Sequence, residues 1–139
     1  MHVVLFKNNS MADLFFLTII KHLITNNLDG FEEGLKAGRR FVDPFALHNK
    51  IYTKIESDNV IFYLNLFIVQ NISDINVTVE YLENENIAIL VTFDEHLDIF
   101  KHKTSIQFIS GIIYYVFNQL LKNKIEIRSN GNSIIIKFQ

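Results

Sequence analysis

The chain has 139 residues, a formal net charge of −2 and 49% hydrophobic residues, which is the size and composition of one compact domain. It has no cysteine, so disulfides, thiolate metal sites and thiol nucleophiles are excluded. The 13 basic and 15 acidic residues give no basic surface for nucleic acid, and no apolar run reaches the roughly 20 residues of a membrane span. We therefore expect a cytoplasmic protein that binds neither nucleic acid nor membrane.

A first helix is predicted after Ser10, where Asp13 completes a weak capping box and a run of apolar residues extends to Ile24. Four polar residues of this helix share one stripe, because they are spaced three or four positions apart: Thr18, Lys21, His22 and Thr25. The helix is apolar over more than one of its other faces. An exposed apolar face favours association, so we expect an oligomer.

The next segments are less regular. Glycines at positions 30, 34 and 38 each cost a helix about 1 kcal/mol relative to alanine, so residues 28–40 could continue the helix, bend or form a loop. Asp43 before Pro44 is typical of an N-cap followed by proline in the first turn. Apolar residues then recur every four positions, which predicts a second helix from Pro44 to about Glu56.

The rest of the chain predicts a mixed order of helices and strands. Ser57 and Asp58 can cap a third helix that is apolar on almost every side, from Val60 to Val69, and we expect it to be buried on most sides. Period-two alternation predicts strands at 77–82 and 87–93, joined by a hairpin loop at 83–86. A fourth helix over 105–122 precedes a second hairpin, with its turn at 129–132.

This element order predicts an α+β fold in which helices lie on one face of a mixed or antiparallel sheet. We expect a single domain over residues 1–139. Its helical front section covers residues 1–56, and the α+β section covers residues 57–139.

Two segments of the α+β section resemble the GHKL fold, the ATPase fold of histidine kinases. Asn65-Leu66-Phe67-Ile68 lies in a helix before a hairpin, like the N-box, and residues 107–138 resemble the last helix and closing hairpin. The family's magnesium-binding asparagine is replaced by Val69, and Asp94-Glu95-His96-Leu97-Asp98 lacks the glycines that admit the nucleotide. The resemblance therefore implies a degenerate scaffold without ATP hydrolysis and without a cofactor.

A degenerate GHKL scaffold behind helices is similar to histidine phosphotransferases of the ChpT type, which are dimers that relay phosphate between response regulators. That family's phosphoacceptor segment corresponds to His22-Leu23-Ile24-Thr25, with Gly34-Leu35 twelve residues after His22. The resemblance implies that His22 accepts the phosphoryl group from a receiver domain or a histidine kinase. Leu23 replaces the family's acidic neighbour.

The same resemblance implies a homodimer. Helical spacing places a receiver-docking surface near the first helix, with three residues as candidates: Lys21, Thr25 and Lys36.

Two other interpretations stay open. The chain could be a non-catalytic protein–protein interaction module, an oligomeric adaptor that binds through its apolar helices. A second possibility is a zinc or manganese site among acidic residues and histidines near the middle of the chain: Asp94, Glu95, His96, Asp98 and His102. A charged surface loop explains that cluster better, so we expect no metal.

Overall fold

The computed structural model describes residues 17–72, 77–81, 88–93 and 102–138, and the structural statements below refer to these ranges. Residues 17–25 are helical, and the predicted start of this first helix, after Ser10 and with Asp13, lies outside the described residues. The elements that follow are α2 (Gly30–Gly38), α3 (Val42–His48), the 3-10 helix η1 (Ser57–Asn59), α4 (Val60–Asn71), β1 (Val77–Tyr81), β2 (Ala88–Phe93), α5 (Lys103–Leu120), β3 (Ile125–Asn130) and β4 (Ser133–Phe138).

The four strands form one antiparallel sheet in the order β1-β2-β4-β3. In this register Val79 lies opposite Val91, and Ile127 lies opposite Ile136. Both predicted strand pairs are therefore confirmed over the described residues, while the predicted hairpin loop at 83–86 lies outside them, and the sheet is antiparallel rather than mixed. Gly131 has a φ of 61° in the turn between β3 and β4, a conformation that glycine adopts without steric cost.

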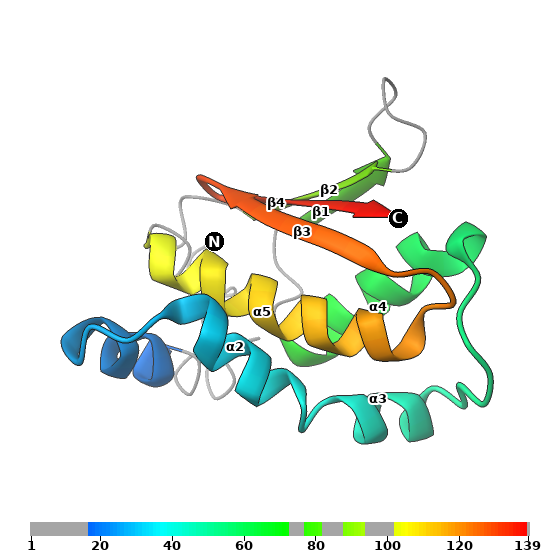
Figure 1. Cartoon of the computed structure of the whole chain (residues 1–139), viewed down its shortest axis with the longest axis horizontal. Helices are drawn as coiled ribbons and strands as arrows, with labels where there is room; N and C mark the ends of the chain where they lie inside the picture. The colour runs from blue at the N-terminus through cyan, green and yellow to red at the C-terminus, as the bar shows by residue number, and fades with distance from the viewer. Residues whose placement is uncertain (1–16, 73–76, 82–87, 94–101, 139) are drawn as a thin grey trace, which may run out of the picture.

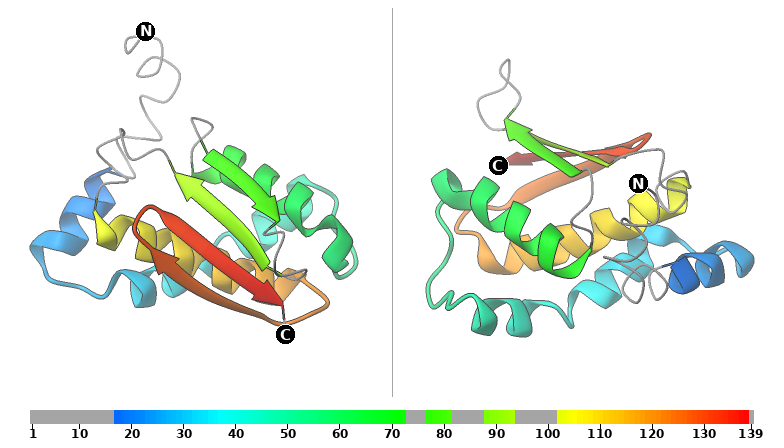
Figure 2. Two further views of the ribbon diagram at one scale, coloured as in Figure 1. Left: turned by 90° about the horizontal axis from the view of Figure 1, so that it is seen from above. Right: turned by 180° about the vertical axis from the view of Figure 1, so that it is seen from behind.

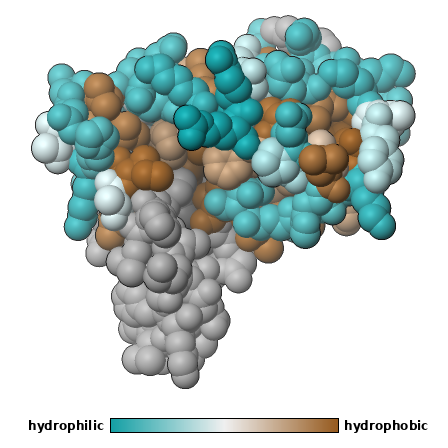
Figure 3. Space-filling view, turned by 90° about the horizontal axis from the view of Figure 1, so that it is seen from below, coloured by the Kyte–Doolittle hydropathy of each residue, from teal (hydrophilic) through white to brown (hydrophobic). Residues whose placement is uncertain are grey.

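The described helices lie on one face of this sheet, which confirms the predicted α+β class (Figures 1 and 2). α4 and α5 pack directly under the strands. α2 and α3 form a further layer below them, and α2 runs along α5. Figure 3 shows the molecule from the side of α2 and α3, where hydrophobic residues reach the surface between hydrophilic ones.

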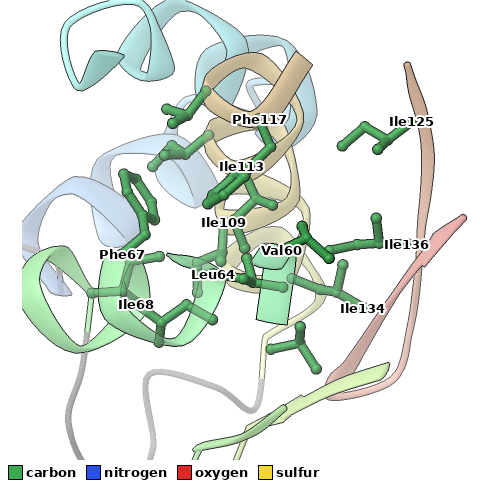
Figure 4. Close-up of a cluster of buried hydrophobic side chains, with 14 of the residues drawn as sticks. Val60, Leu64, Phe67, Ile68, Ile109, Ile113, Phe117, Ile125, Ile134 and Ile136 are labelled. Atoms are coloured by element: carbon green, nitrogen blue, oxygen red, sulfur yellow. The ribbon is translucent and has the colours of Figure 1, made fainter. Parts of the chain in front are cut away.

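The core lies between α4, α5 and the sheet (Figure 4). Its fully buried side chains come from all three: Leu64, Phe67 and Ile68 of α4, Ile109, Ile113 and Phe117 of α5, and Ile134 of β4. Phe67 is at the centre of an aromatic group. Its ring meets those of Phe45 and Phe117 edge-on, at centroid distances of 5.0 and 5.8 Å. This group joins α3 to the layer above it.

α2 is a regular helix despite its three glycines, and it resolves the segment that the sequence left open. Asp29 caps it by accepting a hydrogen bond from the backbone N–H of Glu32 at 3.2 Å. All three glycines are buried, on the side that faces α5. A Cβ on Gly38 would lie 2.9 Å from the Cβ of Tyr115. Close packing of α2 on α5 therefore offsets the low helix propensity of glycine.

The predicted helix from Pro44 to Glu56 is wrong at both ends. α3 begins at Val42, so Asp43 lies inside the helix and is not its N-cap. It ends at His48 because Lys50 adopts a φ of 55°. The backbone N–H of Lys50 donates to the Leu47 carbonyl, and that of Ile51 donates to the Ala46 carbonyl. These two bonds form a Schellman motif, which closes the helix.

The chain after α3 is extended where the sequence predicted helix. Ile55 forms a parallel β-bridge with Leu121, just after α5 ends. Its N–H donates to the Leu120 carbonyl at 2.7 Å, and its own carbonyl accepts from Lys122 at 2.9 Å. The four-residue spacing of apolar side chains up to Ile55 is therefore not helical periodicity. The side chain of Ile55 is buried in the core.

The prediction that the third helix is buried on most sides is also wrong. α4 buries one side, but Phe62 is 64% exposed and Val69 is 48% exposed. Ser57 and Asp58 lie in η1, and the N-cap position of α4 is Asn59, whose side chain makes no capping hydrogen bond. The helix lies at the margin of its layer, so α5 and the sheet cover only part of its apolar surface.

Candidate functional site

His22, the predicted phosphoacceptor, is exposed on the first helix and hydrogen-bonded to Asn26. The amide nitrogen of Asn26 lies 3.1 Å from the ring Nδ1 and donates to the backbone carbonyl of His22 at 2.8 Å. A carbonyl accepts only from a donor, so this bond fixes which end of the Asn26 amide is the nitrogen. The same amide nitrogen can only donate, so Nδ1 is the acceptor side of the 3.1 Å contact.

This arrangement differs from what phosphotransfer through Nε2 requires. A neutral histidine attacks with the ring nitrogen that carries no proton, and a hydrogen-bond acceptor at Nδ1 is what leaves Nε2 unprotonated. Asn26 instead presents a donor to Nδ1. Within the described ranges, no carboxylate is in hydrogen-bond contact with the His22 ring. The geometry thus leaves His22 as a prediction and does not strengthen it.

The three residues predicted to dock a receiver domain lie on two different helices. Lys21 and Thr25 are exposed on the first helix together with His22. Lys36 is exposed on α2, where its ammonium nitrogen lies 2.7 Å from a Glu33 carboxylate oxygen. The hydrogen bond and the charge of Glu33 raise the pKa of Lys36 above its ordinary value. Lys36 is therefore held within its own helix, one turn from its partner.

The metal hypothesis falls mostly outside the described residues. Positions 94–98 lie there, and His102 is exposed just before α5. Among the residues that the structure describes, no group of three histidine, aspartate or glutamate side chains could hold a metal ion. Likewise, none of the described helices is long and apolar enough to span a bilayer.

One surface of the described structure groups exposed apolar side chains on a single helix. Phe62, Leu66 and Val69 lie four and three positions apart on α4, so they form one stripe, which we term the α4 face. Leu66 is half-buried between its two exposed neighbours. The ring of Phe62 packs edge-on against that of Tyr63 at 5.1 Å. The sequence signal for this face is weak, because α4 is apolar on almost every side; Asn65, which is exposed three positions after Phe62 and four before Val69, is the polar residue that marks it.

A groove runs beside β3, between that strand and the helices. Its volume is about 500 Å³, and a smaller hollow of about 280 Å³ adjoins it and shares Phe31, Ile127 and Arg128 with it. The ring of Phe31 lies 5.8 Å from that of Tyr114, which also lines the groove. Residues of β3 and β4 also line the groove: Glu126, Arg128, Ile135 and Lys137.

The chain was also compared with known proteins. No protein-family model matches it, and no curated protein shows significant similarity to it.

Proposed function

We propose that this protein is a non-catalytic protein–protein interaction module, an oligomeric adaptor that binds a protein partner through the α4 face. The observation that carries this proposal is the exposure of Phe62 and Val69 on one stripe of a helix whose opposite side is in the core. Exposed aromatic and aliphatic side chains that are grouped on one helix are typical of protein interfaces.

The α4 face is also presented on a fixed support. Leu64 and Phe67 are fully buried on the opposite side of α4, and they anchor the helix against α5. A partner that covers the α4 face therefore needs to order few residues of this protein, which lowers the entropic cost of binding. Burial contributes about 25 cal/mol per Å² of apolar surface removed from water.

The test is co-purification from cells that express the tagged protein at its native level. The wild type and a Tyr52→Glu control, which alters an 80% exposed side chain outside α4, should retain the same partner in stoichiometric amount. The variants Phe62→Glu and Val69→Glu should lose it while keeping the wild-type circular dichroism spectrum. The partner is then purified and its affinity for all four proteins measured. If the four affinities are equal, the α4 face is not the binding surface.

Phosphotransfer through His22 is the second candidate, because the imidazole is exposed on a helix whose buried side includes Ile20 and Leu23. In this proposal a homodimer exchanges phosphate with a receiver domain on the degenerate GHKL-like scaffold. The order α4-β1-β2-α5-β3-β4 supports the scaffold, and Val69 in place of the magnesium-binding asparagine supports the lack of ATP hydrolysis.

This second candidate has its own assay. The protein is incubated with a receiver domain that carries labelled phosphate, and transfer of label is followed for the wild type and His22→Ala. Label on the wild type alone supports transfer. Equal labelling of both proteins, or of neither, rejects it. The ¹⁵N shifts of the ring provide a further check, since an attacking Nε2 requires the neutral tautomer with its proton on Nδ1.

A further inference from the structure

β3 is an edge strand, and the described structure leaves its outer side open. The sheet order places β4 on one side of it and no strand on the other. Every edge strand carries unpaired backbone N–H and C=O groups, which other strands can pair with. The groove next to β3 shows that α2 and α5 do not fill the space beside this edge.

The side chains of β3 show that the edge is incompletely covered. Ile125 and Ile136, which also face the core, are each only 2% exposed. Ile127 faces the core between them in the register, but it is only half-buried and lines the groove. Glu126 and Arg128 flank it on the other face of the strand, and both are exposed. The strand therefore alternates an under-covered apolar residue with two opposite charges.

We propose that β3 pairs in antiparallel fashion with β3 of a second copy of this chain. The two-fold axis that relates the copies passes midway between the two Ile127 residues, which lie opposite each other. In this register Glu126 lies opposite Arg128 of the second copy, and Arg128 lies opposite its Glu126. Two four-stranded sheets then become one continuous sheet. Such an interface is self-complementary, as a two-fold contact must be.

The charges select this register from its competitor. Directly opposite residues of an antiparallel pair point to the same face. The helices of both copies therefore stay on one side of the joined sheet only if a residue of β3 lies opposite its own copy, with the two-fold axis between them. For the six residues of β3, two such registers pair five residues of each copy. The register centred on Arg128 places Arg128 opposite Arg128 of the second copy, and these two positive charges repel each other. The register centred on Ile127 instead pairs Glu126 of each copy with Arg128 of the other.

The same register also buries more of the Ile127 side chain. Ile127 lies opposite Ile127 of the second copy, at a Cβ separation of roughly 4.5–5.5 Å. The pair covers the half-exposed isoleucine beside Phe31 and Tyr114. This inference goes beyond the α4 face and does not depend on it, because α4 packs near β1 at the other edge of the sheet.

Disulfide trapping tests the register directly, since the chain has no cysteine of its own. Ile127→Cys is expected to form a covalent dimer under mild oxidation. Asn130→Cys is the matched control on the same exposed edge. In this register the two copies of residue 130 are about 20 Å apart, so the control should stay monomeric on a non-reducing gel. Equal cross-linking of both variants, or of neither, overturns the proposal.

Charge reversal tests the pairing without a covalent bond. Arg128→Glu and Glu126→Lys each place like charges opposite one another in both pairs between the copies, and each should weaken the dimer about tenfold or more in sedimentation equilibrium. Glu126→Lys also lies opposite Lys137 within its own sheet, so Arg128→Glu is the cleaner of the two tests. An equimolar mixture of the two variants restores opposite charges in both pairs, so a heterodimer should form with nearly wild-type affinity. Rescue also shows that both variants fold. A wild type that is monomeric at every concentration, or a mixture that stays as weak as its components, contradicts the proposal. Phe62→Glu should leave this dimer intact, which separates it from the α4 face.

Discussion

Gly34 of α2 and Gly111 of α5 pack backbone against backbone. A Cβ on Gly34 would lie 2.9 Å from the Cα of Gly111 and would also overlap the carbonyl oxygen of Phe108. A Cβ on Gly111 would lie 2.8 Å from the Cα of Gly34. This contact holds α2 against α5, which in turn packs under the sheet.

Gly34→Ala is therefore expected to destabilise the protein. In an exposed helix the same change stabilises by about 1 kcal/mol, because alanine has the higher helix propensity. Here the methyl group meets backbone atoms that cannot rotate away, and we expect a net loss of about 3 kcal/mol in the free energy of unfolding. Urea denaturation at fixed protein concentration measures it.

Gly131→Ala serves as the control for this substitution. A Cβ there meets no atom within 4 Å, but the φ of 61° disfavours alanine. Its loss should be about 1 kcal/mol. If Gly34→Ala is as stable as the wild type, α2 and α5 can move apart to accommodate the methyl group at little cost in free energy.

The contact between Gly34 and Gly111 shows why part of the fold could be predicted from the sequence and part could not. Alternation at 77–81 and 88–93 and the Asn-Gly pair within the predicted turn at 129–132 are local signals; the structure has strands at the first two and a turn at 131–132, with Ser129 and Asn130 still in β3. The glycines of α2 are different. They look unfavourable one by one, and only the position of α5 shows what they permit.

The candidate surfaces were harder to predict than the strands. α4 is apolar on almost every side, and only the single polar residue Asn65 within its apolar run marks the side of Phe62 as the surface and that of Phe67 as the core. The hydrogen bond between Asn26 and the His22 ring depends on a spacing of four residues, which is readable in the sequence. That the Asn26 amide nitrogen is the donor follows only from its second bond, to the His22 backbone carbonyl. The position of His22 on an exposed helix was predictable; the contact of its ring with Asn26 was not.

Two phenylalanines of α4 should respond differently to truncation. Phe67 is fully buried, and its ring lies among those of Phe41, Phe45 and Phe117. Phe67→Ala leaves a cavity there, so we expect a loss of about 4 kcal/mol. Phe62 is 64% exposed, and Phe62→Ala should change stability by no more than about 0.5 kcal/mol. Thermal and urea unfolding of the pair check this. Similar losses would mean that Phe62 is also covered in solution.

Two buried serines of α5 give a matched comparison of hydrogen bonding. Ser110 Oγ donates to the Ile106 carbonyl at 2.8 Å, whereas Ser105 Oγ is buried without a hydrogen-bond partner among the described residues. An unpartnered buried hydroxyl costs about 1–3 kcal/mol. Ser105→Ala should therefore stabilise the protein by about 1 kcal/mol, while Ser110→Ala should be neutral or destabilise it by a similar amount. If Ser105→Ala destabilises, the hydroxyl has a partner in solution.

The cap of α3 offers a stabilising change at a position without a packing role. Lys50 is exposed and adopts a φ of 55° at the position of the Schellman motif that glycine usually occupies. Lys50→Gly removes the steric cost of a side chain in that conformation, and part of the gain is lost to the greater freedom of glycine in the unfolded chain. We expect a net gain of about 0.5–1 kcal/mol, measured as a higher urea midpoint with an unchanged slope.

Asn27 provides the control, because it has a φ of 51° after the first helix and closes it with the same pair of bonds. Asparagine already tolerates this conformation, so Asn27→Gly should change stability by less than Lys50→Gly. Equal gains at both positions would show that side-chain strain is not the cause. A loss at Lys50 would show that the lysine side chain itself stabilises the turn, against the geometry described above.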